Sequence, residues 1–238
     1  MIKDRAQKSI ALKFCVSKRW LPQLEVDVES TSRIEKSKFL LTDLDILAIS
    51  TSPVGEHLKF VFDCKSGIRE SGIARAFWLH GVMSKVSASH GFVVMGPKVN
   101  LSKDHRLSSS DLGISLLHDF EFGDLAQGLD GSVDISNEFS LAADIDCWDK
   151  YFNIKSKYQT LSSYIDFSRS SFWLIKDAGE QCRKTVAKLR AIRAELDPSK
   201  EEHLCIFGDA ICLFLLSISN LANRLFLVLM QPADKDEF

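Results

Sequence analysis

The sequence lacks the patterns that define disulfide-stabilised, zinc-binding, secreted and repeat proteins. None of its six cysteines lies in a CxxC pair, and they are scattered along the chain. Free thiols in a reducing compartment are therefore expected, rather than a disulfide framework or a zinc site. The basic N-terminus has no apolar run of the length that a secretory signal needs. With no internal repeat and no low-complexity tract, the chain is expected to be a cytoplasmic globular protein.

A continuous apolar run long enough for a clear membrane span is also lacking. The most apolar stretch is AICLFLLSISNLA at residues 210–222, and Asp209 and Arg224 bracket it. A transmembrane helix needs roughly 20 apolar residues. The sequence therefore favours a buried core helix within residues 201–230, with no membrane partner, over a membrane segment.

Positive charge is missing from one long segment. Residues 111–149 contain ten Asp or Glu and no Lys or Arg, whereas residues 150–200 contain eleven Lys or Arg against five acids. Such segregation produces local fields that the net charge of -2 hides. We expect a first domain at residues 1–122, then an acidic linker and an α-helical region at 123–238.

The first half of the chain has the pattern of an α/β core. Apolar runs at residues 24–30, 39–50 and 58–65 predict three strands, and the short turns between them indicate an antiparallel meander. A helical apolar period follows Gly67. The wholly apolar stretch GFVVMG at residues 91–96 then predicts a strand buried on both faces. A short helix is also predicted at the N-terminus.

The second half is predicted to be helical. Apolar residues recur every three or four positions over residues 172–196, which indicates one amphipathic helix, and residues 201–230 give a last, very apolar helix. Basic side chains lie on the polar side of the first of these helices. A solvated face is the favoured interpretation, and pairing with the acidic segment or phosphate binding are the alternatives. The candidate nucleic-acid contacts among them are Arg183, Lys184 and Lys188.

Paired carboxylates and a lysine point to a site at the predicted strands. Asp43 and Asp45 lie two apart on one strand, and Asp63 and Lys65 lie two apart on the next, so each pair shares a face. Close carboxylates repel unless a cation lies between them, and Mg²⁺ takes carboxylate oxygens and waters. Lys65 could then orient a water or stabilise charge on a phosphate. The alternative is an exposed ion pair, which is typically worth under about 1 kcal/mol.

In order, LTDLDILAIS, FVFDCKSG, a helix and GFVVMG resemble the PD-(D/E)xK nuclease superfamily, which has the restriction-endonuclease-like fold. The resemblance covers about residues 1–100 and implies an α/β core of helix, three antiparallel strands, helix and strand. It implies that Asp45 and Asp63 bind the metal, that Lys65 is the lysine of the (D/E)xK motif, and that the Cys64 backbone carbonyl is a further metal ligand. The implied activity is Mg²⁺- or Mn²⁺-dependent hydrolysis of phosphodiester bonds in nucleic acid, with DNA favoured over RNA.

Several positions stay open. The acid that the family often carries on its first helix has no clear counterpart, since Asp4 is a poor match. Asp43 is either a supporting ligand or a surface residue, and Arg75 is either a phosphate contact or part of a solvated helix face. Glu25, Asp27 and Glu29 share one face of the first strand, and one of them could reach the site, although a solvated face is favoured.

Two other classes of function compete with a nuclease. The chain could be a non-catalytic nucleic-acid or protein binding module that retains the fold. It could instead be an interaction protein whose C-terminal helices form a homo-oligomer or bind a protein partner.

Overall fold

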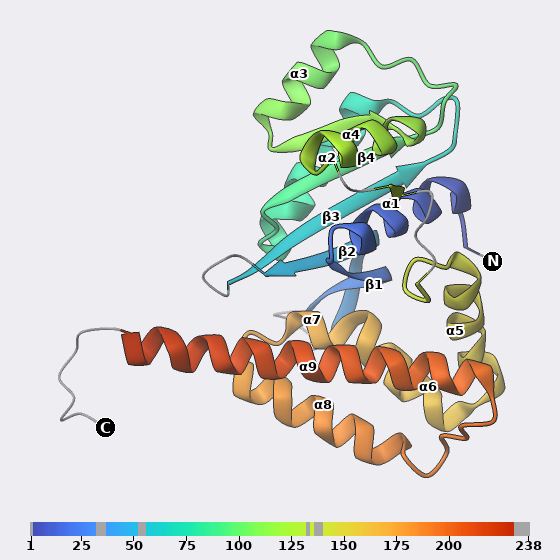
Figure 1. The fold of residues 1–238 in the computed structure, drawn as a ribbon, viewed down its shortest axis with the longest axis vertical. Coiled ribbons are helices and arrows are strands. Elements are labelled where there is room, and N and C mark those ends of the chain that lie inside the picture. Colours follow the sequence, from blue (N-terminus) through green and yellow to red (C-terminus); the bar gives the residue numbers. More distant parts are fainter. Residues whose placement is uncertain (1, 32–36, 52–55, 132–133, 136–139, 231–238) are drawn as a thin grey trace. The chain divides into compact units, whose positions relative to one another are not determined.

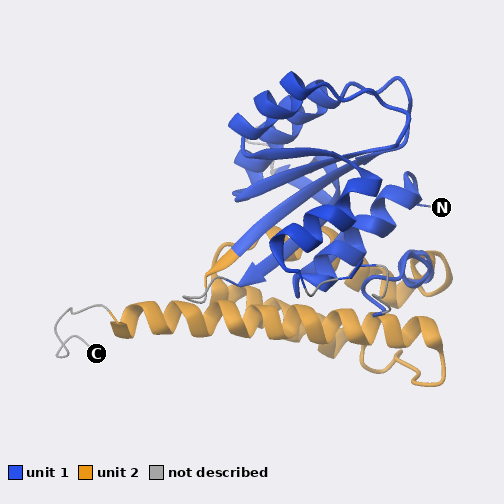
Figure 2. Cartoon of the chain, turned by 45° about the horizontal axis from the view of Figure 1, so that its top comes forward, with its two compact units in different colours: residues 1–51, 58–152 blue, residues 52–57, 153–238 orange. Residues whose placement is uncertain are grey.

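A computed structural model of the 238-residue chain describes residues 2–31, 37–51, 56–131, 134–135 and 140–230 (Figure 1). The chain forms two compact units (Figure 2). Unit 1 comprises residues 1–51 and 58–152, and unit 2 comprises residues 52–57 and 153–238.

The chain begins with an α/β arrangement around one mixed sheet. Its order of helix, three strands, helix and strand is the predicted one. The sheet has the strand order β1-β2-β3-β4-β5, in which β1 and β2 are antiparallel while β3, β4 and β5 are parallel (Figure 1). The elements are α1 (Arg5–Ser17), β1 (Leu21–Thr31), β2 (Lys38–Thr51), β3 (His57–Lys65), α2 (Gly72–Val86), β4 (His90–Met95), α3 (Lys103–Asp111), β5 (Ile114–His118), a 3-10 turn (Asp119–Glu121), α4 (Phe122–Leu129) and α5 (Ile145–Lys157).

Helices cover both faces of the sheet. Phe92 of β4 contacts Phe14 of α1 and Phe122 of α4, with ring centroids 5.8 Å and 6.2 Å away. A Cβ added at the neighbouring Gly91 would instead meet Leu79 and Met83 of α2. Since successive residues of a strand point to opposite faces, α1 and α4 lie on one face and α2 on the other. The predicted burial of this strand on both faces is thus confirmed.

Local sequence explains where the helices of unit 1 begin. Ser71 caps α2, because its hydroxyl accepts a hydrogen bond from the Ala74 N–H, and Ser102 caps α3 in the same way through His105. The sequence KDHRLSSSD of α3 has no apolar stripe, and this helix was not predicted. The strand β5 follows α3, and the 3-10 turn then leads into α4.

Unit 2 is helical, as predicted. Its further elements are α6 (Gln159–Asp166), a π-helical turn (Phe167–Ser171), α7 (Phe172–Leu174), α8 (Ala178–Ile192) and α9 (Glu201–Met230). The prediction of one continuous helix over residues 172–196 is wrong. The chain becomes extended at Ile175, and Asp177 caps a new helix by accepting a hydrogen bond from the Glu180 N–H at 2.6 Å. The helix α8 also ends four residues earlier than expected.

The helix α9 is only partly the buried helix that was expected. Its buried residues all lie between His203 and Ser217, and none of the remaining residues to Met230 is buried. Among the described residues it is the one helix that is long and apolar enough to cross a membrane. Its most apolar window is 18 residues long and has a mean hydropathy of 2.0. Only 28% of that window is buried, so a large apolar surface stays exposed.

Candidate functional site

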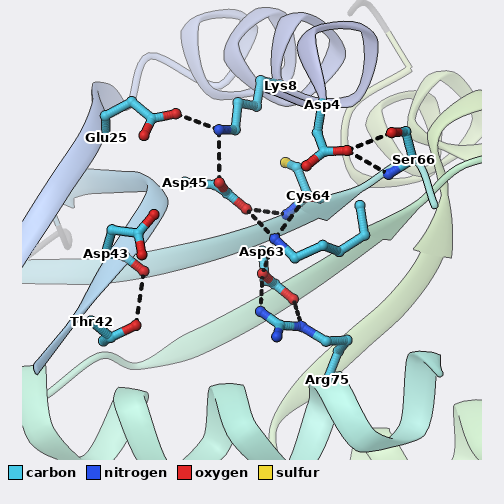
Figure 3. Close-up of polar contacts among 11 residues, drawn as sticks. Asp4, Lys8, Glu25, Thr42, Asp43, Asp45, Asp63, Cys64, Ser66 and Arg75 are labelled. Carbon is cyan, nitrogen blue, oxygen red and sulfur yellow. Dashed lines mark hydrogen bonds and ion pairs between the residues drawn. The ribbon is translucent and has the colours of Figure 1, made fainter. Parts of the chain in front are cut away.

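Six charged side chains from two helices and three strands of unit 1 meet around the middle of β2 and the C-terminal end of β3 (Figure 3). Asp45, Asp63 and Lys65 were the predicted site residues, and they lie on the neighbouring strands β2 and β3. The group, called the charge cluster below, consists of Lys8 from α1, Glu25 from β1, Asp45 from β2, Asp63 and Lys65 from β3, and Arg75 from α2.

Asp45 is buried and both of its carboxylate oxygens are bonded. Oδ1 accepts from Lys8 Nζ at 2.8 Å, and Oδ2 accepts from the Cys64 N–H at 2.7 Å and from Lys65 Nζ at 3.2 Å. Burial alone raises the pKa of Asp45, but the charges of Lys8 and Lys65 outweigh burial and hold this pKa below its usual value of 3.8. Asp45 is therefore ionised at neutral pH.

Asp63 is held by Arg75 in a two-pronged ion pair. Arg75 Nε donates to Oδ2 and the terminal nitrogen donates to Oδ1, each at 2.6 Å. Lys65 Nζ also contacts Oδ1, at 2.9 Å. Only 2% of the Asp63 side chain is exposed, and these contacts satisfy its buried carboxylate oxygens. Arg75, which the sequence left open between a phosphate contact and a solvated helix face, is thus part of the charge cluster.

Lys65 lies at the centre of three oxygen atoms. Its Nζ is 2.9 Å from Asp63 Oδ1, 3.0 Å from the Cys64 carbonyl oxygen and 3.2 Å from Asp45 Oδ2. We call these three atoms the oxygen triad. Burial opposes the charge on Lys65, but Asp45 and Asp63 outweigh it and raise the pKa of Lys65 above its usual 10.5. The amine is therefore a cation at neutral pH.

Lys8 is a member that the sequence did not predict. It is 2% exposed and shares one face of α1 with the buried residues Ala11, Leu12 and Cys15, at spacings of three, four and seven. Burial opposes its charge, yet Asp45 and Glu25 raise its pKa above 10.5. That helical spacing was the available signal. Lysine is a polar residue type, so it was not predicted to be buried.

Lys8 bridges acids that stand opposite each other on β1 and β2. Glu25 lies between the residues paired with Ile46 and Leu44, so it faces Asp45, and its carboxylate is bonded to Lys8 Nζ. Glu25 has a φ of 54°, which is unusual for a non-glycine residue within a strand. The favoured interpretation of Glu25 as part of a solvated face is therefore wrong.

Two acids near the charge cluster do not belong to it. Asp43 is exposed and its carboxylate lies apart from the cluster (Figure 3). Asp4, the poor match for a first-helix acid, precedes α1 with a φ of 49° and accepts hydrogen bonds from Ser66 N and Oγ at 2.8 Å and 2.5 Å. Asp4 thus joins the start of α1 to the end of β3.

The basic candidates of α8 belong to unit 2, whereas the charge cluster belongs to unit 1. Arg183 and Lys184 are exposed, and Lys188 is half-buried. Lys184 pairs with Glu180 at 2.7 Å, and Lys188 Nζ donates to the Ser163 carbonyl at 3.4 Å. Such contacts are typical of a solvated helix surface.

The donor set of the oxygen triad fits a hard divalent cation. Two carboxylates and one carbonyl are the kind of oxygen ligands that Mg²⁺ takes together with waters, and an ammonium already lies among them. In the part of the chain that the structure describes, no group of three or more His, Cys, Asp or Glu side chains could hold a metal ion. A metal at the triad would therefore rest on two carboxylates, a backbone carbonyl and water.

Comparison with protein-family models, with curated proteins and with solved structures finds no match to this chain. The function is therefore argued from the charge cluster itself.

Proposed function

We propose that unit 1 is a PD-(D/E)xK nuclease-like core that hydrolyses phosphodiester bonds of nucleic acid, DNA in preference to RNA. The observation that carries this proposal is the oxygen triad, in which Asp45, Asp63 and the Cys64 carbonyl surround one cation position. These are the atoms that the resemblance assigns to the metal. The order of helix, three strands, helix and strand supports the same proposal.

In this proposal Asp45, Asp63 and the Cys64 carbonyl hold Mg²⁺ or Mn²⁺. A metal ion bound there supplies Lewis acidity and lowers the pKa of a coordinated water. Lys8 keeps Asp45 ionised and fixes its Oδ1, while the Cys64 N–H fixes Oδ2. Glu25 holds Lys8 from the other side.

Lys65 acts as a cation in the proposed reaction. In the metal-free site Asp45 and Asp63 raise the pKa of Lys65, so the amine is a cation there near neutral pH. With a divalent ion held by the three oxygens, the Lys65 ammonium would be free to reach toward the substrate on its flexible stem. There it stabilises the negative charge that develops on the phosphate. Arg75 is the second cation available for a phosphate oxygen.

A non-catalytic binding module is the second candidate, and the charge balance favours it. Lys8, Lys65 and Arg75 offset Glu25, Asp45 and Asp63, so the charge cluster is neutral without a metal ion. A buried network in which every charge is paired can be retained for structure alone. In that case Arg75 stays on Asp63 and no metal ion enters.

The test is a cleavage assay with plasmid DNA, single-stranded DNA and RNA, each with Mg²⁺, Mn²⁺ or EDTA. The proteins are the parent chain, Asp63→Asn and the control Asp43→Asn, which makes the same change at an exposed strand residue outside the charge cluster. We expect metal-dependent cleavage, preferentially of DNA, by the parent and by Asp43→Asn. Asp63→Asn should lose at least about a hundredfold in rate, because one carboxylate ligand is gone. Equal cleavage by Asp63→Asn and the parent, or none by the parent, would refute the proposal.

A further inference from the structure

The helix α9 has two apolar series, and only one of them is covered. The covered series is His203, Ile206, Ala210, Leu213 and Ser217, at spacings of three and four. Asn220 continues it, and its side-chain amide donates to Gln181 Oε1 of α8 at 2.8 Å. The side of α9 that packs on α8 thus contains a histidine, a serine and an asparagine.

The second series is more apolar than the first, yet it is uncovered. It repeats with the a and d spacing of a heptad over four heptads, and every position is a large apolar residue. Six of its eight residues are exposed by 39–57%, and the other two are half-buried. We call this series the outer face of α9, and it consists of Leu204, Phe207, Ile211, Phe214, Ile218, Leu221, Leu225 and Val228.

Polar residues of α9 avoid the outer face. Asp209, Ser219, Asn223 and Arg224 all fall at other heptad positions. Leu215 and Leu229, which occupy e positions beside the outer face, are 58% and 73% exposed. A stripe made of a, d and e positions is the pattern of a helix whose face packs against other helices in a bundle.

A lipid bilayer does not fit the outer face while α9 is packed on α8. The packing extends along α9 as far as Asn220, and α8 carries the charged residues Arg183, Lys184 and Arg190. Charged side chains are costly in the hydrocarbon region. Only residues 221–230 extend further, and at 1.5 Å per residue they reach about 15 Å, roughly half of the hydrocarbon thickness.

We propose that the outer face of α9 is a homodimer interface, in which α9 of one chain packs on α9 of a second copy. Eight large residues on and beside this face are on average about half exposed: Leu204, Phe207, Ile211, Leu215, Ile218, Leu225, Val228 and Leu229. They offer on the order of 800 Å² per chain, which is the area of a standard stable interface. The heptad repeat makes the face complementary to itself, and the proposal does not depend on the nuclease activity.

The test uses the full chain and one pair of variants. Leu225→Asp places a charge on the outer face, beyond the last buried residue of α9, so the packing of the single chain is untouched. Asn223→Asp is the matched control, since it introduces the same charge two residues away on another side of the helix. Sedimentation velocity between about 1 and 100 µM then measures the dimer dissociation constant, and far-UV circular dichroism checks the helix content.

We expect a dimer for the parent and for Asn223→Asp. Leu225→Asp should weaken the dimer by about a hundredfold or more, because the dimer would bury two added charges and lose two leucines. If Leu225→Asp loses helix content, Leu225→Asn takes its place as the test variant. It adds no charge and should also weaken the dimer. A monomeric parent over the whole range would overturn the proposal, as would a dimer that both Leu225 variants leave unchanged. A monomer that co-sediments with phosphatidylcholine and phosphatidylserine vesicles would instead assign the face to a membrane and overturn it too.

Discussion

Replacing Lys8 by methionine should lower the free energy of unfolding of unit 1 by about 3 kcal/mol at pH 7. Lys8 is buried and bridges Asp45 and Glu25. Removing one partner of a buried ion pair typically costs roughly 3–5 kcal/mol. The lower end is expected here because Asp45 keeps Lys65 and the Cys64 N–H. Methionine retains the apolar stem, so the loss reports the charge rather than the packing.

The matched control is Arg5→Met, which removes a cation from the same helix. Arg5 pairs with Asp146 and Asp149, and its side chain is 35% exposed. Pairs of this kind are worth under about 1 kcal/mol. Urea unfolding followed by tryptophan fluorescence suits the comparison, because three of the four tryptophans, Trp20, Trp78 and Trp148, lie in unit 1.

The pH dependence makes this prediction sharper. In the folded chain the pKa of Asp45 is held below 3.8. The stability that ionised Asp45 contributes is therefore fully present above pH 3.8 and is lost as pH falls through the folded pKa. Lys8 is the first of the charges that hold it down. The difference in free energy of unfolding between the parent and Lys8→Met should therefore be largest near pH 7 and shrink below about pH 4. The reasoning is refuted if Lys8→Met costs no more than Arg5→Met, or if its cost does not change with acidification.

Three further outcomes follow from the same contacts. Asp45→Asn should flatten the loss of stability that the parent shows below about pH 3.8 in urea titrations, and an unchanged acid profile would contradict this. Arg75→Met frees Oδ2 of Asp63 and leaves Oδ1 with Lys65 alone, so calorimetry should give about tenfold tighter Mg²⁺ binding; equal or weaker binding would show that Arg75 does not compete with the metal. Burial lowers the pKa of His90 below 6.5, so the unfolded chain takes up the proton first and unit 1 should lose stability as pH falls below 6.5; His90→Gln should remove that part of the profile, and an identical slope would count against it.

The strands of unit 1 could be predicted because their burial follows the chain directly. Leu24, Val26 and Val28 alternate with the acids of β1, and the apolar run of β4 is covered on both faces. Spacing by two also predicted that Asp63 and Lys65 share a face. These features depend on the local period of a strand, which the sequence carries without knowledge of the tertiary structure.

The rest of the charge cluster depends on how helices cross the sheet. Lys8 precedes Asp45 by 37 positions, and only the packing of α1 brings the two together. The two-pronged contact of Arg75 depends in the same way on the placement of α2. The left-handed φ of Glu25 has no local signal, since glutamate does not favour that region.

The helices of unit 2 show where periodicity misleads. The apolar period runs through Ile175 although the chain is extended there, because an apolar residue in a break can still lie on the buried side. A capping signal was present at the same place. An Asp followed three residues later by a Glu, as at Asp177 and Glu180, is typical of a helix N-terminus. This capping signal sets the start of α8, although the apolar period continues through it.

Mg²⁺ binding at the oxygen triad is the most direct test of the proposed nuclease function. The measurement is calorimetric titration of Mg²⁺ into the parent, Asp63→Asn and Asp43→Asn, alone and with a short phosphorothioate DNA duplex that supplies phosphate ligands. We predict saturable binding by the parent and by Asp43→Asn in the presence of the duplex, and none by Asp63→Asn. The same heat from Asp63→Asn and the parent, or no binding by the parent with the duplex present, would contradict the account.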